Sequence, residues 1–245
     1  MKRIPKSPEQ GPLLAVGAHP DDIEFACGGV IANETRGGRA AHFVVCSAGE
    51  SASLGTPARR KKEARKSAAI LGATLEFILL DGDAHLEPRA RHAIRLAGII
   101  RRLKPAIVLA PSLVGNQHPD HSRLGRLVCD AARLARYGGL RELRSVEPHA
   151  IDQLLFYAVT PGAEPRDVTP ILVDVSEREV QAAWVAAMEA HASQLAGSRN
   201  YVELQLTRAR LHGLQGGVEM AIALFSPDPL IVDSLSRISR SARRF

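Results

Sequence analysis

Short apolar runs alternate with longer segments of helical spacing along the first half of this chain, and that alternation constrains its fold most. The runs are almost continuously apolar, as in strands buried on both faces. They cover residues 13–18, 41–48, 75–81, 106–111, 154–159 and 171–175, and two long helical patterns follow at 176–195 and 201–214. This β-α-β-α order predicts an α/β fold, a Rossmann-like three-layer α/β/α arrangement with a mostly parallel sheet.

The length of 245 residues suits one α/β domain. We expect a disordered lead-in over residues 1–11 and a single domain over residues 12–245. No apolar run reaches the ~20 residues that cross a bilayer, and residues 13–18 are too short for the apolar part of a signal peptide. The sequence therefore predicts a cytoplasmic protein without a membrane span.

The chain is basic, with a formal net charge of +6, but only 4% of its residues are aromatic. The basic runs lack the interleaved aromatic residues of a nucleic-acid platform, so we expect no nucleic-acid partner. A positive field instead suits an anionic small-molecule substrate. The composition is also compatible with a homo-oligomer.

Two related polar motifs follow two of the predicted strands. "HPDDIE" (19–24) lies beyond the first strand and "NQHPDHS" (116–122) beyond the fourth. Because the carboxyl ends of parallel strands share one edge, we expect both motifs in one active site at that edge. An N-capping acidic turn would explain one such motif, but two in equivalent places favour a shared function.

Two clusters of histidine and carboxylate on one edge indicate a divalent cation with a position left for water. A cation would also offset the repulsion among the crowded carboxylates of the first motif. Either Asp21 or Asp22 could be a ligand while the other takes a proton from the attacking water. A nearby histidine, held by a carboxylate such as Asp120, would donate to the oxyanion or the leaving amine. Such ligands accept iron(II) as well as zinc.

The stretch "AVGAHPDDIEFACGGVIA" resembles the first motif of the LmbE-like, or PIG-L, family of zinc-dependent de-N-acetylases, and "NQHPDHS" resembles the second. The stretches "SAGESASLGTPARRKKEARKSAAILGA", "LLDGD" and "AMEAHASQL" are similar to further elements of that family. The resemblance implies a metal-dependent hydrolase that removes the acetyl group from an N-acetylglucosaminyl conjugate through a zinc-activated water.

The resemblance also implies roles for individual residues. By position, His19, Asp22 and His121 would be the zinc ligands, and Asp21 the general base. Spacing alone does not choose between His118 and His121 as the ligand of the second motif, so that assignment rests on the resemblance.

The remaining implied roles belong to His118, Asp120 and Arg60. His118 would stabilise the oxyanion or protonate the amine, Asp120 would orient His118, and Arg60 would contact the substrate. The segment after the second motif looks similar to the bacillithiol-pathway branch, which would imply an anionic glucosaminyl-malate substrate.

One departure from the family pattern lies near the C-terminus. Many relatives carry a Tyr-Ala-Glu-like element there, whereas this chain has Met220 and Ile222 at the Tyr and Glu positions, so the pocket lining could differ. The alternative function is a catalytically inactive sugar- or nucleotide-binding α/β domain. Nucleotide binding is disfavoured because no G-x-G-x-x-G motif follows the first predicted strand.

Overall fold

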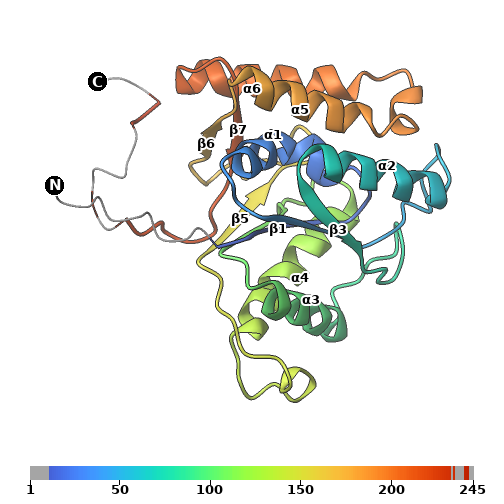
Figure 1. The fold of residues 1–245 in the computed structure, drawn as a ribbon, viewed down its shortest axis with the longest axis vertical. Coiled ribbons are helices and arrows are strands. Elements are labelled where there is room, and N and C mark those ends of the chain that lie inside the picture. Colours follow the sequence, from blue (N-terminus) through green and yellow to red (C-terminus); the bar gives the residue numbers. More distant parts are fainter. Residues whose placement is uncertain (1–10, 233, 235–239, 243–245) are drawn as a thin grey trace.

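Five parallel strands form the central sheet of the computed structural model, which describes residues 11–232, 234 and 240–242 (Figure 1). The order across the sheet is β3 (Ala73–Phe77), β2 (Ala41–Val45), β1 (Leu13–Gly17), β4 (Ile107–Pro111) and β5 (Gln153–Tyr157). The mostly parallel sheet is thereby confirmed. Of the expected lead-in, residues 1–10 lie outside the described part of the chain.

Helices cover both faces of this sheet and complete the expected three layers (Figure 1). One face carries α1 (Asp22–Arg36) and α2 (Pro57–Ile70), and α5 (Arg178–Glu189) and α6 (Tyr201–Gly216) pack outside these helices. The other face carries α3 (Ala90–Leu103) and α4 (Pro119–Ala135), and short 3-10 helices lie at Arg141–Leu143 and Gln194–Ala196. None of the described helices combines the length and apolarity needed to cross a membrane.

The apolar runs divide their side chains between these two layers. In β1, Leu13 and Ala15 pack into the core below α1 and α5, whereas Leu14 and Val16 pack into the core with α3 and α4. Successive residues of a strand point to opposite faces, so a strand covered on both sides must be apolar throughout. This requirement explains why the runs show no alternation of polar and apolar residues.

Two details of the strands differ from the sequence-based expectation. The third strand begins and ends earlier than residues 75–81, because β3 pairs only with β2, and that ladder ends at Val45 and Phe77. The strand at 171–175 is β6 (Ile171–Asp174), which pairs antiparallel with β7 (Ala221–Leu224) outside the central sheet. The partner strand β7 was not predicted.

Helix α1 bends at Cys27, where the backbone leaves helical geometry (φ −141°). The Trp184 indole donates a hydrogen bond to the Glu24 carbonyl at 2.7 Å, which satisfies a backbone oxygen near the bend. A Cβ at Gly28 would lie 2.7 Å from Trp184 Cδ1, so glycine is needed for this close approach. Cys27 itself is buried in the core.

Arg101 of α3 is a fully buried cation whose partners are backbone carbonyls. Its guanidinium donates to the carbonyl oxygens of Ala135, Tyr137, Leu143 and Val146 at 2.7–2.9 Å. These carbonyls belong to the end of α4 and the segment that follows it. Arg101 therefore joins α3 to the chain that leads from α4 to β5.

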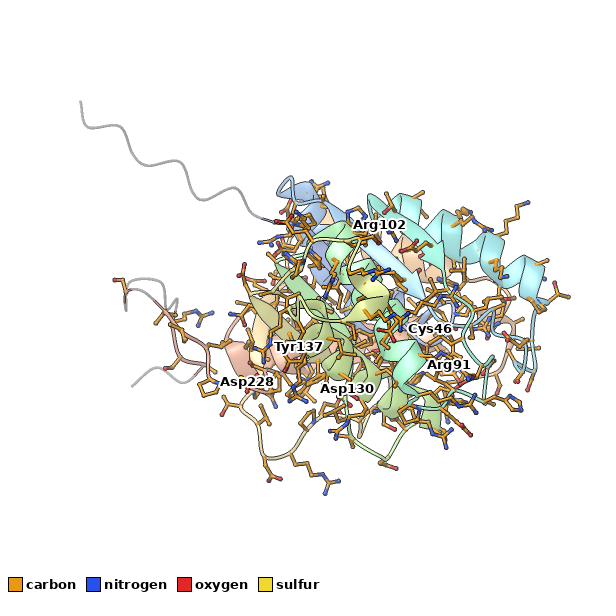
Figure 2. The ribbon with its side chains drawn as sticks, turned by 90° about the horizontal axis from the view of Figure 1, so that it is seen from below. Cys46, Arg91, Arg102, Asp130, Tyr137 and Asp228 are labelled. Carbon is orange, nitrogen blue, oxygen red and sulfur yellow. The ribbon has the colours of Figure 1, made fainter. Side chains whose placement is uncertain are left out.

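We expect Arg101→Met to lower the free energy of unfolding by about 3–5 kcal/mol, since it leaves several buried carbonyls without a donor. Urea denaturation followed by circular dichroism measures the change. The matched control is Arg102→Met at the neighbouring exposed position (Figure 2), which should cost less than about 1 kcal/mol. Equal small losses in both variants would contradict this role of Arg101.

Candidate active site

The two polar motifs meet at the centre of the sheet edge. Strands β1 and β4 are neighbours, and the chain continues from β1 toward β2 on one side and from β4 toward β5 on the other. In open α/β sheets, ligands bind in the crevice at the carboxyl ends of strands where the order reverses in this way. His19 follows β1 and His121 lies in the first turn of α4, so the expected juxtaposition is present.

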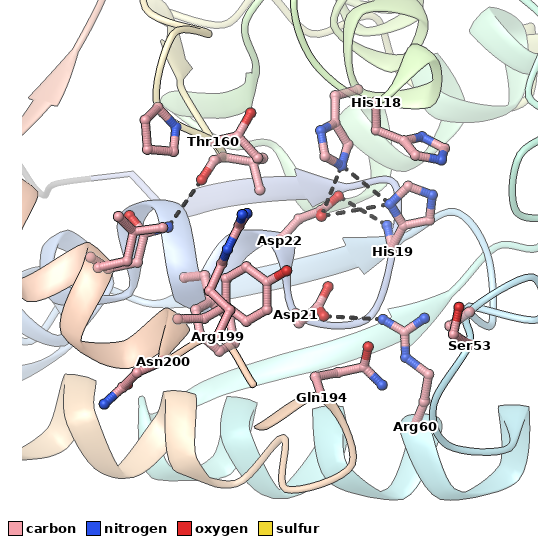
Figure 3. A pocket seen from close by; sticks show the side chains of 18 of the residues that line it. His19, Asp21, Asp22, Ser53, Arg60, His118, Thr160, Gln194, Arg199 and Asn200 are labelled. Atoms are coloured by element: carbon pink, nitrogen blue, oxygen red, sulfur yellow. Dashed lines mark hydrogen bonds and ion pairs between the residues drawn. The ribbon is translucent and has the colours of Figure 1, made fainter. Parts of the chain in front are cut away.

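Three side-chain atoms from these motifs converge in a buried triangle, and Figure 3 labels two of its corners, His19 and Asp22. His19 Nδ1 lies 3.2 Å from His121 Nε2, and His121 Nε2 lies 3.1 Å from Asp22 Oδ1. The third side of the triangle, from His19 Nδ1 to Asp22 Oδ1, is 3.6 Å. All three side chains are buried.

The triangle fits a divalent cation. Tetrahedral zinc with ligand bonds of ~2.0–2.1 Å separates its ligand atoms by about 3.3 Å, close to the observed spacings. The nitrogens His19 Nδ1 and His121 Nε2 also face each other. Without a cation, only one of them can carry the proton of a hydrogen bond between them, whereas a cation can accept the lone pairs of both. Among the described residues, two groups of histidine and carboxylate side chains could hold a metal ion, and one of them consists of His19, Asp22 and His121.

The chain holds Asp22 firmly in this position. Its second oxygen, Oδ2, accepts the backbone N–H groups of Ala18 at 2.8 Å and His19 at 3.0 Å. Although burial disfavours the charged form, His121 and His19 hold the pKa of the Asp22 carboxyl well below its usual range. Asp22 is thus an ionised donor with one oxygen free to face a cation.

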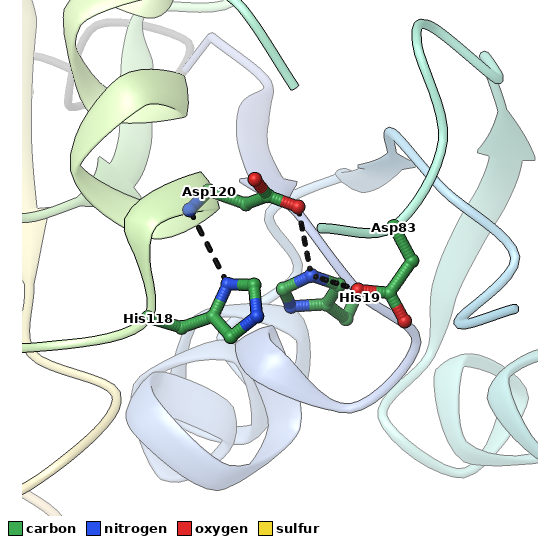
Figure 4. Close-up of side chains that lie close together, drawn as sticks. All are labelled: His19, Asp83, His118 and Asp120. Atoms are coloured by element: carbon green, nitrogen blue, oxygen red, sulfur yellow. Dashed lines mark hydrogen bonds and ion pairs between the residues drawn. The ribbon is translucent and has the colours of Figure 1, made fainter. Parts of the chain in front are cut away.

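Two carboxylates flank the other side of the His19 ring (Figure 4). His19 Nε2 lies 3.0 Å from Asp83 Oδ1 and 3.3 Å from Asp120 Oδ2. A carboxylate on the far nitrogen fixes the tautomer and orientation of a metal-ligating histidine. Sequence reasoning did not assign Asp83, although it lies in the "LLDGD" stretch noted for its resemblance to the family.

His118 and Asp120 contact each other differently from the expected pair. The backbone N–H of Asp120, rather than its carboxylate, donates to His118 Nδ1 at 3.3 Å, and the carboxylate lies beside His19 (Figure 4). Because Nδ1 accepts this bond, neutral His118 carries its proton on Nε2. Partial desolvation by the surrounding groups and the nearby His19 lower the pKa of the His118 imidazole, although the residue is exposed.

Asp21 lies beside the triangle in a strained conformation, with φ at 137°. Such non-glycine outliers persist where the surrounding structure enforces them, often at functional sites. Arg60, buried in α2, donates to Asp21 Oδ2 at 3.1 Å and to the Pro20 carbonyl at 3.0 Å (Figure 3). Burial raises the pKa of the Asp21 carboxyl to about 6, and Arg60 opposes that rise.

The segment that follows α5 contacts side chains of both α1 and α2. His191 Nε2 lies 3.2 Å from Glu24 Oε1, and both side chains are buried. Ser193 donates to the Glu63 carboxylate through its backbone N–H at 3.0 Å and its hydroxyl at 2.5 Å. Sequence reasoning left His191 without a role, because the partner Glu24 lies far away along the chain.

A cavity of about 1050 Å³ opens over the triangle. Of the residues predicted for the site, it is lined by His19, Asp21, Asp22, Arg60, His118 and His121, while Asp120 lies behind His19. Met220 and Ile222 do not line it, since both are buried in the core below α1 and α5. The departure from the family pattern at these positions therefore changes the core packing and leaves the lining of this cavity untouched.

Comparisons with known proteins find a matching family model and similar sequences. Residues 14–132 match the family model described as PIG-L, GlcNAc-PI de-N-acetylase. The chain is 33% identical over 165 residues to 4-oxalmesaconate hydratase of Pseudomonas putida and 30% identical over 160 residues to diacetylchitobiose deacetylase of Thermococcus kodakarensis. Each match covers 59% of this chain, and the chain spans 64% and 59% of those relatives.

Among solved structures, the fold is similar to that of the conserved protein TT1542 from Thermus thermophilus. The TM-score is 0.81 and the identity 33%, with 95% of this chain and 100% of the other covered. The three-layer architecture thus belongs to a known structural group.

Proposed function

We propose that this chain, which belongs to the PIG-L (LmbE-like) family, is a zinc-dependent N-deacetylase. Its substrate would be the acetamide of an N-acetylglucosaminyl conjugate, and the products acetate and a free amine. One observation carries the proposal, namely that the triangle of His19, Asp22 and His121 opens into a cavity that Asp21 also lines. The deacetylases among the relatives support the reaction type.

When bound at the triangle, a divalent cation would polarise the acetamide carbonyl and acidify a water molecule. Asp21 is the general base in this proposal. Its carboxylate lines the cavity but is not one of the three converging donors, so it stays free to take a proton from the attacking water. Arg60 holds this carboxylate in place through the 3.1 Å contact.

His118 stabilises the oxyanion in this proposal. Its Nδ1 accepts the Asp120 backbone N–H, so Nε2 carries the proton and donates a hydrogen bond to the oxyanion. The water adds to the acetamide carbon and gives its proton to Asp21, the C–N bond breaks, and that proton passes from Asp21 to the leaving amine. Asp120 serves twice, holding His118 through its backbone and His19 through its carboxylate.

Arg60 has a second proposed role as a contact for the substrate. It lines the cavity, and its Nε has no hydrogen-bond partner among the described residues. The remaining guanidinium contacts hold Asp21, the Pro20 carbonyl and the Gly49 carbonyl. Arg60 is therefore first a positioning residue for the base, and because its Nε is buried, the proposed substrate contact falls to its terminal nitrogens.

A second candidate function is the addition of water to a carbon–carbon double bond. The 33% identity to 4-oxalmesaconate hydratase favours it. Hydration also needs an acidified water and a proton donor, so the same residues could serve both reactions. The two reactions differ in their products, since only hydrolysis of an acetamide releases acetate.

The decisive experiment measures acetate and free amine after incubation of the zinc-loaded protein with methyl N-acetylglucosaminide and N,N'-diacetylchitobiose. We expect both products in equal amounts. The hydratase candidate is measured in parallel by the loss of 4-oxalmesaconate. Consumption of 4-oxalmesaconate without any amine from the acetylated sugars would replace the deacetylase by the hydratase.

A further inference from the structure

The cavity continues well beyond the residues of the proposed reaction. Its volume of about 1050 Å³ is at the upper end of the roughly 300–1,000 Å³ that accommodate drug-sized ligands. One N-acetylglucosaminyl ring would leave much of this space empty. The outer part is bordered by Phe25 of α1, the segment after β5 at residues 159–161, and the first turns of α6.

Apolar side chains form most of this outer wall. We define the outer wall as Phe25, Val159, Pro161, Tyr201 and Leu204, all of which line the cavity. Tyr201 is 38% exposed, so part of its ring is available to a ligand in the cavity. The outer wall therefore offers an aromatic surface in the same cavity as the proposed site of hydrolysis.

The ring of Tyr201 is held in place by its neighbours. It meets the buried Phe25 ring edge to face, with centroids 6.4 Å apart and an interplanar angle of 83°. The Arg199 guanidinium lies 5.8 Å from the Tyr201 centroid, and Figure 3 shows Arg199 and Asn200 on this side of the pocket. Phe25 belongs to α1, the helix that begins at Asp22, so the outer wall and the triangle both include residues of this helix.

The charges near the outer wall do not form a site for an anion. Arg199 is the one basic residue beside Tyr201 that lines the cavity, and it is exposed to solvent. Glu203, which also lines the cavity, carries the opposite charge and pairs with Arg210. Burial of a ligand's apolar surface against the outer wall would therefore contribute more to binding than pairing with these charges.

We infer that the outer wall binds an apolar aglycone of the substrate, and specifically an aromatic ring that stacks on Tyr201. The inference rests on the proposed deacetylase function and assigns the chemical class of the group attached to the sugar. Aromatic rings pair favourably beyond the area that they bury. The enzyme would then select aryl N-acetylglucosaminides over glycosides with a small aglycone.

The test compares kcat/KM for acetate release from phenyl and methyl N-acetylglucosaminide of the same anomeric configuration. We expect the wild-type enzyme to favour the phenyl glycoside about tenfold. Tyr201→Ala should abolish this preference, because the methyl glycoside has no ring to stack on Tyr201 and so loses less than the phenyl glycoside. Tyr201→Phe, which keeps the ring, should retain the preference.

Three outcomes would overturn the inference. Equal kcat/KM for the two glycosides in the wild type means that the wall binds no aryl group, and an unchanged preference in Tyr201→Ala means that Tyr201 does not. Preference for a carboxymethyl glycoside that disappears in Arg199→Ala means that the aglycone is anionic instead.

Failure of the proposed function has a different signature, since no glycoside would then release acetate. Titration calorimetry with the phenyl glycoside still decides the inference in that case. Binding should weaken about tenfold in Tyr201→Ala and stay unchanged in Tyr201→Phe. Equal affinity in all three proteins would reject the aromatic wall.

Discussion

Asp21→Asn is expected to retain the bound cation and to lose roughly a thousandfold in the rate of acetate release, within the 10²–10⁴ range of general acid–base catalysis. Asparagine has the size of aspartate and can still accept a hydrogen bond from Arg60, so the 3.1 Å contact has a replacement. It cannot take a proton from water. Because asparagine has the same shape as aspartate, it can keep the strained backbone at this position.

Two measurements on the same preparation separate the possible roles of Asp21. Acetate release gives the rate, and elemental analysis gives the cation content per chain. Asp130→Asn is the matched control, since Asp130 lies on the outer side of α4 (Figure 2), and it should keep both values. Loss of the cation in Asp21→Asn would make Asp21 a ligand, and an unchanged rate with the cation retained would remove it as the base.

The sequence predicted the site as far as topology determines it. Buried parallel strands bring their carboxyl ends to one edge, so a histidine after β1 and two histidines after β4 had to come close together. The observed triangle of His19, Asp22 and His121 agrees with the ligand set implied by the family resemblance. Whether these three residues bind zinc in solution is still a prediction.

Contacts that depend on the path of loops could not be predicted in the same way. Asp83 reaches His19 from the segment after β3, and the direction of that segment depends on how the edge strand ends. The Asp120 carboxylate turns toward His19 because the His118 side chain caps the start of α4 and accepts the Asp120 backbone N–H. The sequence pattern indicates which residues come close together in the fold, but not which of their atoms face one another.

The short strand β7 was missed for a related reason. Its four residues follow the long helix α6 after a glycine turn, and a run of that length carries little periodicity. Its pairing with β6 is a long-range contact, and so are the buried pairs of His191 with Glu24 and Ser193 with Glu63. Tertiary structure, rather than local preference, determines all of these contacts.

His121→Ala is expected to reduce the bound cation from about one per chain to less than a tenth and to abolish acetate release. The variant removes one corner of the buried triangle and leaves Asp22 Oδ1 without the partner that lies 3.1 Å away. Two remaining donors bind a divalent cation weakly, because a catalytic site typically needs three protein ligands. Chelation of the wild-type protein should cause the same loss, and added zinc should restore activity in the wild type alone.

His118→Ala is the matched control, since it removes the other histidine of the same motif. His118 is exposed and contributes no atom to the triangle, so its variant should keep the full cation content while acetate release falls about 10²–10⁴-fold. Comparison of the two variants therefore decides which of these histidines is the metal ligand, a choice that the spacing of the second motif left open. Cation loss in His118→Ala with retention in His121→Ala would exchange the two roles, and the observed 3.2 Å contact between His19 and His121 would then be packing alone.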